Sequence, residues 1–284
     1  MTSIGYIGAV DTPEYRVLIS RKDAAVVATT VAEAQPDTHT TIYDSAEDLV
    51  ERADIDGLVI ATPPDRRAVS ASLAIQRGLP FYIVPPVSVS VAEALEIADA
   101  VAHKNLVTAV SRPMRYSVNL VQIRQTVRRD GAAFLLARYV GRENGTDLVS
   151  RSEPLIDLLR YIGGNLEKVA CFHHSDRHFV ADLVLSGGTR AMLSAVDGWD
   201  HGEEQSIEAI TGAGSRMTWA YGPNMLTLDA YETRAGDTVE GTHTASFAAL
   251  ITAIRTGYRA QILADVADSV ETMKALEAIR TASA

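Results

Sequence analysis

About the first 110 residues of the chain alternate between short apolar runs and longer runs of mixed polarity. The apolar runs are typical of strands, and we predict strands at 3–8, 24–29, 56–62, 81–84 and 105–110. Short buried strands separated by amphipathic helices indicate a parallel sheet with right-handed crossover connections. Such sheets bind ligands beyond the carboxyl ends of their strands, so the candidate site lies in the loops at 8–13, 30–36, 62–67 and 84–88.

Local signals mark the ends of several of the intervening helices. Ser45 and Ser90 stand at N-cap positions, and each is followed three residues later by an acidic residue, which is the pattern of a capping box. Thr12 and Pro13 are a hydroxyl N-cap and a proline at the first helical position. Gly78 closes the helix predicted from residue 64. These signals agree with the alternation of strands and helices.

The pattern changes after a predicted helix at 117–129. Strand-like runs now follow one another through glycine-containing turns, of which "SGG" (186–188) and "GAGS" (212–215) are hairpin signals. One helix at 153–164 interrupts the strands, and two helices are predicted from Ser246 to the end.

We therefore predict a fold of the α/β class with two domains. Residues 1–116 form a Rossmann-type domain with a parallel sheet, and residues 117–284 form an α+β domain with a largely antiparallel sheet. The chain has 284 residues, of which 47% are hydrophobic, which is enough for two modest cores.

Charge and cysteine content argue against several classes of protein. The formal net charge of -10 offers no basic surface to nucleic acid or to an anionic membrane. No apolar run is long enough to span a bilayer, and the N-terminus lacks the pattern of a secretory leader. The single cysteine, Cys171, allows no internal disulfide and fits a reducing compartment. We expect a cytoplasmic protein that binds a small molecule.

Four strings follow one another in a characteristic order. The segment 54–100 contains "ATPP" and "FYIVPP", and "RPMRYSVN" occupies 112–119. "SIEAITGAGSRM" (206–217) and "SFAALITAIRTGYRA" (246–260) come later. In order and spacing these strings resemble the Gfo/Idh/MocA family of NAD(P)-dependent sugar and cyclitol dehydrogenases, and the resemblance covers essentially the whole chain.

The resemblance implies NAD or NADP at the strand-end loops and a homo-oligomer formed through the sheet of the second domain. The residues expected to contact the cofactor are Gly8, Val10, Thr30, Thr62, Pro63, Pro64 and Pro85. The weak candidates for catalytic groups are Arg115, Tyr116, Asp157 and His201. Arg115 could pair with a substrate carboxylate or phosphate, or form a structural salt bridge.

The residues that carry the chemistry of the family are replaced. The family carries a lysine in the string "EKP", and Pro85 stands at the position of that lysine here. The family's second motif, D-x-G-x-H-x-x-D, falls on 150–157, where Ser150 and Pro154 replace the first aspartate and the histidine. Only Asp157 is kept. Alcohol oxidation needs a group that takes the hydroxyl proton, and each such group contributes about 10²–10⁴ in rate. Proline has no proton to exchange. The three replacements predict that the usual reaction is lost.

The string "GAVDTP" (8–13) stands where a dinucleotide-binding chain carries G-x-G-x-x-G, and only Gly8 remains. Val10 places a branched side chain where the backbone approaches the pyrophosphate, and Pro13 removes an N–H from the helix end. Asp11 adds a negative charge there. Thr30 replaces the acidic residue that binds the ribose. A plain turn without ligand, bound NAD and bound NADP all remain open.

Two polar strings have less specific interpretations. "HHSDRH" combines three histidines with an aspartate: His173, His174, Asp176 and His178. Adjacent strand residues point to opposite faces, so we expect a strand end or turn there and predict no metal site. "VDGWDHGEE" (196–204), which includes Asp197 and His201, is either a solvated loop or part of a cleft.

Three functions remain open. The chain is either an oxidoreductase-like protein that has lost redox catalysis, or a divergent NAD(P)-dependent oxidoreductase whose proton-transfer group moved to Tyr116, Asp157 or His201. The third possibility is a non-redox lyase, hydrolase or cyclase that uses the cleft of the second domain.

Overall fold

The computed structural model describes residues 1–31, 39–142, 146–175, 177–198, 203–221, 225–229 and 232–282. The chain divides into two compact units. The first comprises Met1–Tyr116 and Glu240–Val270, and the second comprises Ser117–Val239 and Glu271–Ala284. A search of the described helices finds none with the length and apolar character needed to cross a membrane.

The first unit is built on a six-stranded parallel sheet with the order β3-β2-β1-β4-β5-β6. Its strands are β1 (Thr2–Gly8), β2 (Ala24–Thr29), β3 (Thr41–Ile42), β4 (Gly57–Ala61), β5 (Phe81–Ile83) and β6 (Thr108–Val110). Its helices are α1 (Pro13–Ile19), α2 (Ala46–Arg52), α3 (Pro64–Arg77), α4 (Val91–His103) and α8 (Val239–Thr256), and α9 (Val266–Ala282) begins there. The predicted parallel α/β architecture is confirmed.

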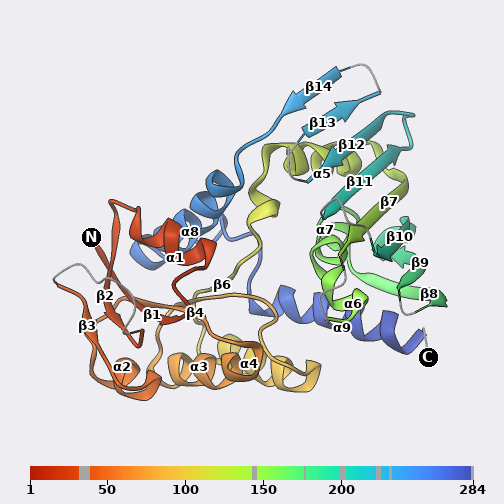
Figure 1. Cartoon of the computed structure of the whole chain (residues 1–284). Coiled ribbons are helices and arrows are strands. Elements are labelled where there is room, and N and C mark those ends of the chain that lie inside the picture. The colour runs from red at the N-terminus through yellow and green to blue at the C-terminus, as the bar shows by residue number, and fades with distance from the viewer. Residues whose placement is uncertain are drawn as a thin grey trace. The chain divides into compact units, whose positions relative to one another are not determined.

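Helices cover both faces of this sheet, as Figure 1 shows. One core lies under α2, α3 and α4, where Leu49 and Ile75 pack with Ile7 and Ile60 of the strands. The opposite core lies under α1 and α8. Successive side chains of a strand point to opposite faces, so β1 supplies apolar groups to both cores.

The predicted helix ends are confirmed. The hydroxyl groups of Thr12, Ser45 and Ser90 accept hydrogen bonds from the backbone N–H groups three residues on. Pro13 is the first residue of α1, and Gly78 adopts a left-handed conformation with φ of 77° after α3. These caps satisfy amide groups that have no partner within the helix.

Residues 240–270 pack with the first unit, whereas the sequence assigned them to the second. The helix α8 also begins at Val239 rather than at Ser246. Its Phe247 ring stacks on Tyr82 of β5, with 4.2 Å between the ring centroids. This contact joins positions far apart in the sequence, so local pattern could not reveal it.

The second unit contains an eight-stranded sheet with the order β14-β13-β12-β11-β7-β10-β9-β8. Its strands are β7 (Ala132–Gly141), β8 (Leu166–Ser175), β9 (His178–Leu185), β10 (Arg190–Asp197), β11 (Glu204–Thr211), β12 (Arg216–Ala220), β13 (Met225–Leu228) and β14 (Glu232–Ala235). Strands β7 and β10 pair in parallel, and the other pairings are antiparallel. The two predicted hairpins join β9 to β10 and β11 to β12.

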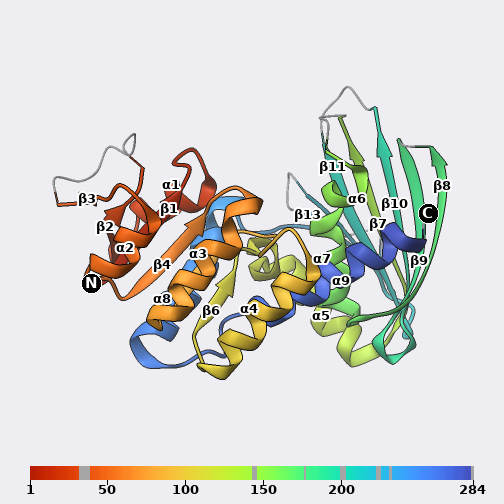
Figure 2. The same ribbon diagram turned by 90° about the horizontal axis from the view of Figure 1, so that it is seen from below.

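Three helices lie on one side of this sheet: α5 (Val118–Asp130), α6 (Leu148–Arg151) and α7 (Glu153–Gly163). Figure 2 shows them beside the strands. The strands β9, β10 and β11 alternate between buried and half-exposed residues. One face of the sheet therefore belongs to a core, and the other is partly open to solvent.

Candidate functional site

The residues predicted to contact a cofactor come together at one edge of the first unit. Gly8 ends β1, Thr30 follows β2, Thr62 follows β4, and Pro85 follows β5. These four strands are neighbours in the order β2-β1-β4-β5 and run in parallel. Their carboxyl ends thus share an edge, which is where doubly wound sheets bind ligands.

Gly8 is required by the close approach of two strand ends. It pairs with Ala61 of β4 and has φ of 142°. A Cβ atom at this position would lie 2.4 Å from the carbonyl carbon and oxygen of Ala61. The one glycine of the fingerprint that survives therefore has a structural reason of its own, apart from any ligand.

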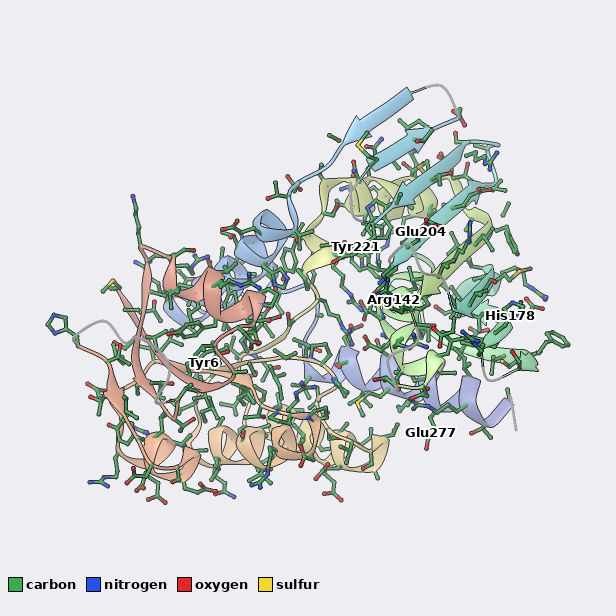
Figure 3. All side chains as sticks on the ribbon, viewed as in Figure 1. Tyr6, Arg142, His178, Glu204, Tyr221 and Glu277 are labelled. Atoms are coloured by element: carbon green, nitrogen blue, oxygen red, sulfur yellow. The ribbon has the colours of Figure 1, made fainter. Side chains whose placement is uncertain are left out.

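The loop after β1 folds back onto Tyr6, which Figure 3 labels. The Tyr6 hydroxyl donates to the Ala9 carbonyl at 2.5 Å and lies 3.1 Å from the Thr12 hydroxyl. Burial raises the pKa of Tyr6 to about 12, so the hydroxyl remains a donor at neutral pH. Thr12 in turn caps α1 by accepting from Tyr15 N–H at 3.2 Å.

The other residues of this loop offer little to a diphosphate. Val10 is half-buried and packs against the core under α1. Asp11 is exposed and carries a negative charge. Pro13 begins α1 without an N–H, and Glu14 in the first turn is buried. The loop is held by its own side chains, since the hydroxyls of Tyr6 and Thr12 both donate to the Ala9 carbonyl.

The turn after β4 presents a different surface. Pro63 occupies the N-cap of α3 and makes no side-chain capping bond, and Pro64 begins the helix. Thr62 is 8% exposed, and its Oγ1 is buried without a hydrogen-bond partner among the described residues. A buried hydroxyl that lacks a partner costs free energy, so a hydrogen bond from a ligand to this atom would be favourable. Thr62 is the group here that best fits a bound dinucleotide.

A buried polar cluster lies between α1 and α8, and the sequence analysis did not identify it. The Ser111 hydroxyl donates to Oε1 of Glu14 at 2.7 Å, and Nδ1 of His243 lies 3.8 Å from the same oxygen. The hydroxyls of Tyr82 and Ser246 are 3.0 Å apart. All five residues are buried. Burial lowers the pKa of His243, and the charge of Glu14 partly opposes that shift.

A signal for this cluster exists in the sequence. Glu14 precedes Val17 and Leu18 by three and four residues, and His243 precedes Phe247 by four. Residues at these spacings share one face of a helix. Both titratable groups therefore stand on apolar helix faces, where an ionisable residue is unusual.

Arg115 and Tyr116 are held by the segment before α9, and Arg115 also by the first turn of that helix. The Arg115 guanidinium donates to the Leu263 carbonyl at 2.6 Å and pairs with Asp268 at 2.7 Å. The Tyr116 hydroxyl donates to the Gln261 carbonyl at 3.1 Å and accepts from Leu263 N–H at 3.0 Å. Both side chains thus stabilise the first unit, and the structural salt bridge is the alternative for Arg115 that the contacts favour.

Asp157 lies in the interior of the second unit, on α7. Oδ1 of Asp157 accepts from the Thr272 hydroxyl at 3.0 Å, and the same hydroxyl accepts from Arg160. Arg160 also donates to Oδ1 of Asn165 at 2.7 Å. Asp157 is 2% exposed, so it belongs to a buried network that joins α7 to α9.

The remaining polar candidates lie only in part within the described residues. His201, together with Asp176, Trp199 and Asp200, lies outside them, as do the side chains of His173 and His174. His178 begins β9, as Figure 3 shows, so the histidine string lies at a hairpin between two strands. In the described part of the chain, no three His, Cys, Asp or Glu side chains are grouped to hold a metal ion.

Asp197 forms a buried ion pair with Arg151 of α6. Arg151 also donates to the Arg142 carbonyl at 2.7 Å, and Oδ1 of Asp197 is buried without a hydrogen-bond partner among the described residues. Asp197 was a candidate from the sequence, but its partner could not be predicted because 46 residues separate the two.

Comparisons with known proteins agree with this architecture. No family model matches the sequence. A segment of 86 residues is 29% identical to the rhizopine catabolism protein MocA of Rhizobium meliloti. This segment covers 30% of the chain and 27% of that protein, so the match spans about a quarter of the curated relative.

Solved structures match over the whole length. The scyllo-inositol dehydrogenase of Lactobacillus casei, solved with NAD(H) and scyllo-inositol, has a TM-score of 0.82 at 17% identity, with 100% of this chain and 97% of that chain covered. The UDP-N-acetylglucosamine 3-dehydrogenase of Acidithiobacillus ferrooxidans has a TM-score of 0.81 at 18% identity, and the match covers 99% of this chain and 97% of that chain. A dehydrogenase of Chromobacterium violaceum has a TM-score of 0.84 at 18% identity, and the match covers 99% of this chain and 95% of that chain.

The chain has the fold of these solved dehydrogenases, and a segment of it is similar to MocA. The resemblance expected from the four strings is confirmed, and so are the Rossmann-type sheet and the mixed, mostly antiparallel second sheet.

The stretch 150–157, which the resemblance aligns with D-x-G-x-H-x-x-D, lies on α6 and the start of α7. The Ser150 hydroxyl donates a hydrogen bond to Asp147 and accepts one from Arg280. Pro154 is exposed in the first turn of α7. Partial burial alone would raise the pKa of Asp147, but the bonds from Ser150 and the charge of Arg280 outweigh it and lower that pKa. The side chains at 150 and 154 therefore help to build helix ends in this structure.

Proposed function

We propose that this chain is an oxidoreductase-like protein that binds NAD or NADP at the carboxyl edge of β1, β2, β4 and β5 and does not oxidise sugars or cyclitols in the manner usual for its fold family. A bound nicotinamide supplies or accepts a hydride. The residues of this chain bind and orient it, with Thr62 as the principal hydrogen-bonding group. The family's Lys, Asp and His correspond to Pro85, Ser150 and Pro154, and that observation carries the proposal.

The contacts of the surviving candidates support this proposal. Tyr116 and Arg115 are bonded to the backbone before α9, and Asp157 is bonded to Thr272. A general acid or base must reach the proton that it transfers in a substrate complex. Groups that hold structural hydrogen bonds in the interior would have to give them up first, so relocation of the reaction to these residues is disfavoured.

One observation favours a second candidate, a divergent oxidoreductase with a relocated proton-transfer group. Glu14 and His243 form a buried carboxylate–imidazole pair in the unit that carries the proposed cofactor edge. Such pairs are typical of sites with tuned acid–base properties. This candidate predicts turnover that is lost on His243→Gln, whereas the main proposal predicts no polyol turnover to lose.

Binding and turnover separate the two candidates. We expect the fluorescence of NADH or NADPH to change on titration with the protein, and we expect no NADH to form from NAD with scyllo-inositol, myo-inositol or a UDP-sugar. A flat titration with both reduced cofactors at millimolar concentration would refute cofactor binding. Polyol turnover at the median enzyme rate, about 10 per second, would refute the loss of function.

Restoring the replaced groups provides a complementary test. The triple variant Pro85→Lys, Ser150→Asp and Pro154→His puts the family's residue types at the three positions. Pro154 is exposed, so the histidine can be accommodated there without repacking a core. Gain of polyol oxidation would support the view that only the proton-transfer groups were lost, and the single Pro154→His variant serves as the partial control.

We also propose that the second unit forms a homo-oligomer through the half-exposed face of its sheet. Apolar residues of neighbouring strands share this face: Leu136, Val180, Met192 and the 59% exposed Phe172. By the strand register, Asp182 and Ser194 lie on the same face beside these apolar residues, so the face is mixed in character. Its exposed apolar side chains favour association with a second copy. Light scattering should give at least the mass of a dimer, and Phe172→Asp together with Met192→Asp should reduce it. A monomeric wild-type protein would refute this proposal.

A further inference from the structure

Arg67 is a cation on the buried face of α3. It is 8% exposed and follows the N-cap residue Pro63 by four positions. Its Nε donates to the Thr62 carbonyl at 2.7 Å, and its Nη1 donates to the carbonyls of Pro85 and Pro86 at 2.6 and 3.1 Å. One planar group thus connects the turn after β4 to the turn after β5.

The composition of the two turns explains why a side chain supplies these donors. Strands β4 and β5 pair up to Ile60 and Ile83, and a last backbone bond of 3.0 Å joins Val84 N–H to the Ile60 carbonyl. Beyond that point the chain carries two Pro-Pro pairs, at 63–64 and 85–86. Proline has no N–H, so the ladder of backbone bonds cannot continue. The guanidinium of Arg67 supplies hydrogen-bond donors that connect the two turns instead.

The turns joined in this way contain four of the residues assigned to the cofactor: Thr62, Pro63, Pro64 and Pro85. Thr62 is held through its carbonyl by Arg67, while its buried Oγ1 has no partner among the described residues. Fixing the carbonyl fixes the peptide plane that follows Thr62 and so restricts its backbone, while the β-branched side chain has few χ1 rotamers. The two turns are then set before a ligand arrives, which lowers the free-energy cost of binding.

We propose that Arg67 is a positioning residue for the dinucleotide: it fixes the turns after β4 and β5 so that Thr62 and Pro85 meet the ligand together. This inference rests on the proposed function, since it assigns a role in that same site. This role depends on the several N–H donors that the planar guanidinium directs at both turns, its fork, rather than on its positive charge. An arginine presents several donors in a fixed plane, whereas a lysine ammonium is a point charge on a flexible stem.

The comparison of lysine with arginine therefore supplies the test. Arg67→Lys keeps the charge and loses the fork, and Arg67→Met loses both. Arg52 is the control, because it is an exposed arginine at the end of α2, outside the loops assigned to the ligand site. The variants Arg52→Lys and Arg52→Met should bind cofactor as the wild type does. Each protein is titrated with NADH and NADPH, and hydrogen exchange is measured on peptides that span residues 79–90.

We expect both Arg67 variants to bind the reduced cofactor about tenfold or more weakly than the wild type, and to exchange faster around residues 87–90 in the absence of cofactor. Melting temperatures measured without ligand show whether the whole unit is affected. Should Arg67→Met fail to fold, Arg67→Lys carries the test by itself. Wild-type affinity or wild-type exchange in Arg67→Lys would overturn the inference.

The two proposals fail in different ways. A wild-type protein that binds neither NADH nor NADPH refutes the proposed function. In that case the exchange experiment still shows whether Arg67 holds the two turns. A wild-type protein that binds cofactor, together with an Arg67→Lys variant that binds equally well, refutes only the role of Arg67.

Discussion

The hydroxyl of Thr272 donates a 3.0 Å hydrogen bond to Oδ1 of Asp157 inside the second unit. The hydroxyl oxygen of Thr272 also accepts a hydrogen bond from Arg160, so this one hydroxyl joins a buried carboxylate to a buried guanidinium. Asp157 is the residue that the resemblance aligns with the last aspartate of D-x-G-x-H-x-x-D. Its contacts assign it a part in holding α9 to α7.

Thr272→Val should therefore destabilise the protein strongly. The valine matches threonine in shape but removes the hydrogen bonds to Asp157 and Arg160, and a loss of about 2–4 kcal/mol in the free energy of unfolding is expected. Urea denaturation measures it. Thr281→Val is the control on the same helix: Thr281 is exposed and bonds only the Glu277 carbonyl in the structure, so its replacement should change stability by less than about 0.5 kcal/mol. Equal effects at the two positions would contradict the buried network.

Gly8→Ala should destabilise the first unit more than Gly78→Ala. Both glycines have positive φ, at 142° and 77°. An added Cβ meets the Ala61 carbonyl 2.4 Å away at Gly8, whereas nothing lies within 4 Å at Gly78. Backbone strain alone costs about 1 kcal/mol at Gly78, and the steric clash at Gly8 adds to it. Chemical denaturation of both variants tests the order, and the reverse order would show that β1 and β4 do not approach so closely.

His243 makes stability depend on pH. Burial lowers its pKa in the folded protein below the ordinary value of 6.5, so the unfolded chain binds more protons between those two values. Stability should then fall as pH decreases from 6.5 through the folded pKa, with a slope of at most about 1.4 kcal/mol per pH unit for one group. The groups that face His243 are Glu14 of α1 and, through Glu14, Ser111 after β6.

Denaturation curves at several pH values check this expectation. His243→Phe should flatten the fall in stability between about pH 7 and pH 5, because the buried titrating group is gone. His103→Gln replaces an exposed histidine at the end of α4 and should leave the slope unchanged. An unchanged slope in His243→Phe would assign the pH dependence to other groups.

Tyr6→Phe should loosen the loop after β1. The variant loses the hydrogen bond to the Ala9 carbonyl, and about 1–2 kcal/mol of stability with it. The folded pKa of Tyr6, about 12, lies above its ordinary value of 10.0, so its contribution is present below pH 10 and is lost as pH rises toward 12. Tyr6→Phe should therefore lose less stability than the wild type on alkaline titration. Tyr258→Phe, at a 56% exposed position, is the control and should follow the wild type.

The features that local sequence determines were predictable. The strand at 24–29 was predicted with the bounds that the structure has, and the caps at Thr12, Ser45 and Ser90 were found where the sequence placed them. A run of apolar residues and a hydroxyl before a helix act over a few positions. The short strand β3 was not predicted, because both of its residues, Thr41 and Ile42, are exposed and give no apolar pattern.

The partners of polar groups were not predictable, because they depend on contacts between distant positions. Arg115 bonds the Leu263 carbonyl 148 residues later, and Tyr82 lies beside Ser246 at a separation of 164 residues. Arg67 is different. It precedes Ala71 and Ala74 on α3 by four and seven residues, so its place on the apolar face was visible in the sequence. Attention to charged residues on apolar faces would have found it.

The helix α8 belongs to the unit that the chain starts and then leaves at Tyr116. While the protein is being synthesised, Tyr82 lacks the Phe247 ring that stacks on it until α8, which ends at Thr256, has left the ribosome. The strands from β7 to β14 emerge in the interval and have all their pairing partners at hand. Neither unit can therefore be complete before its last segment is made, residues 240–270 for the first unit and 271–284 for the second.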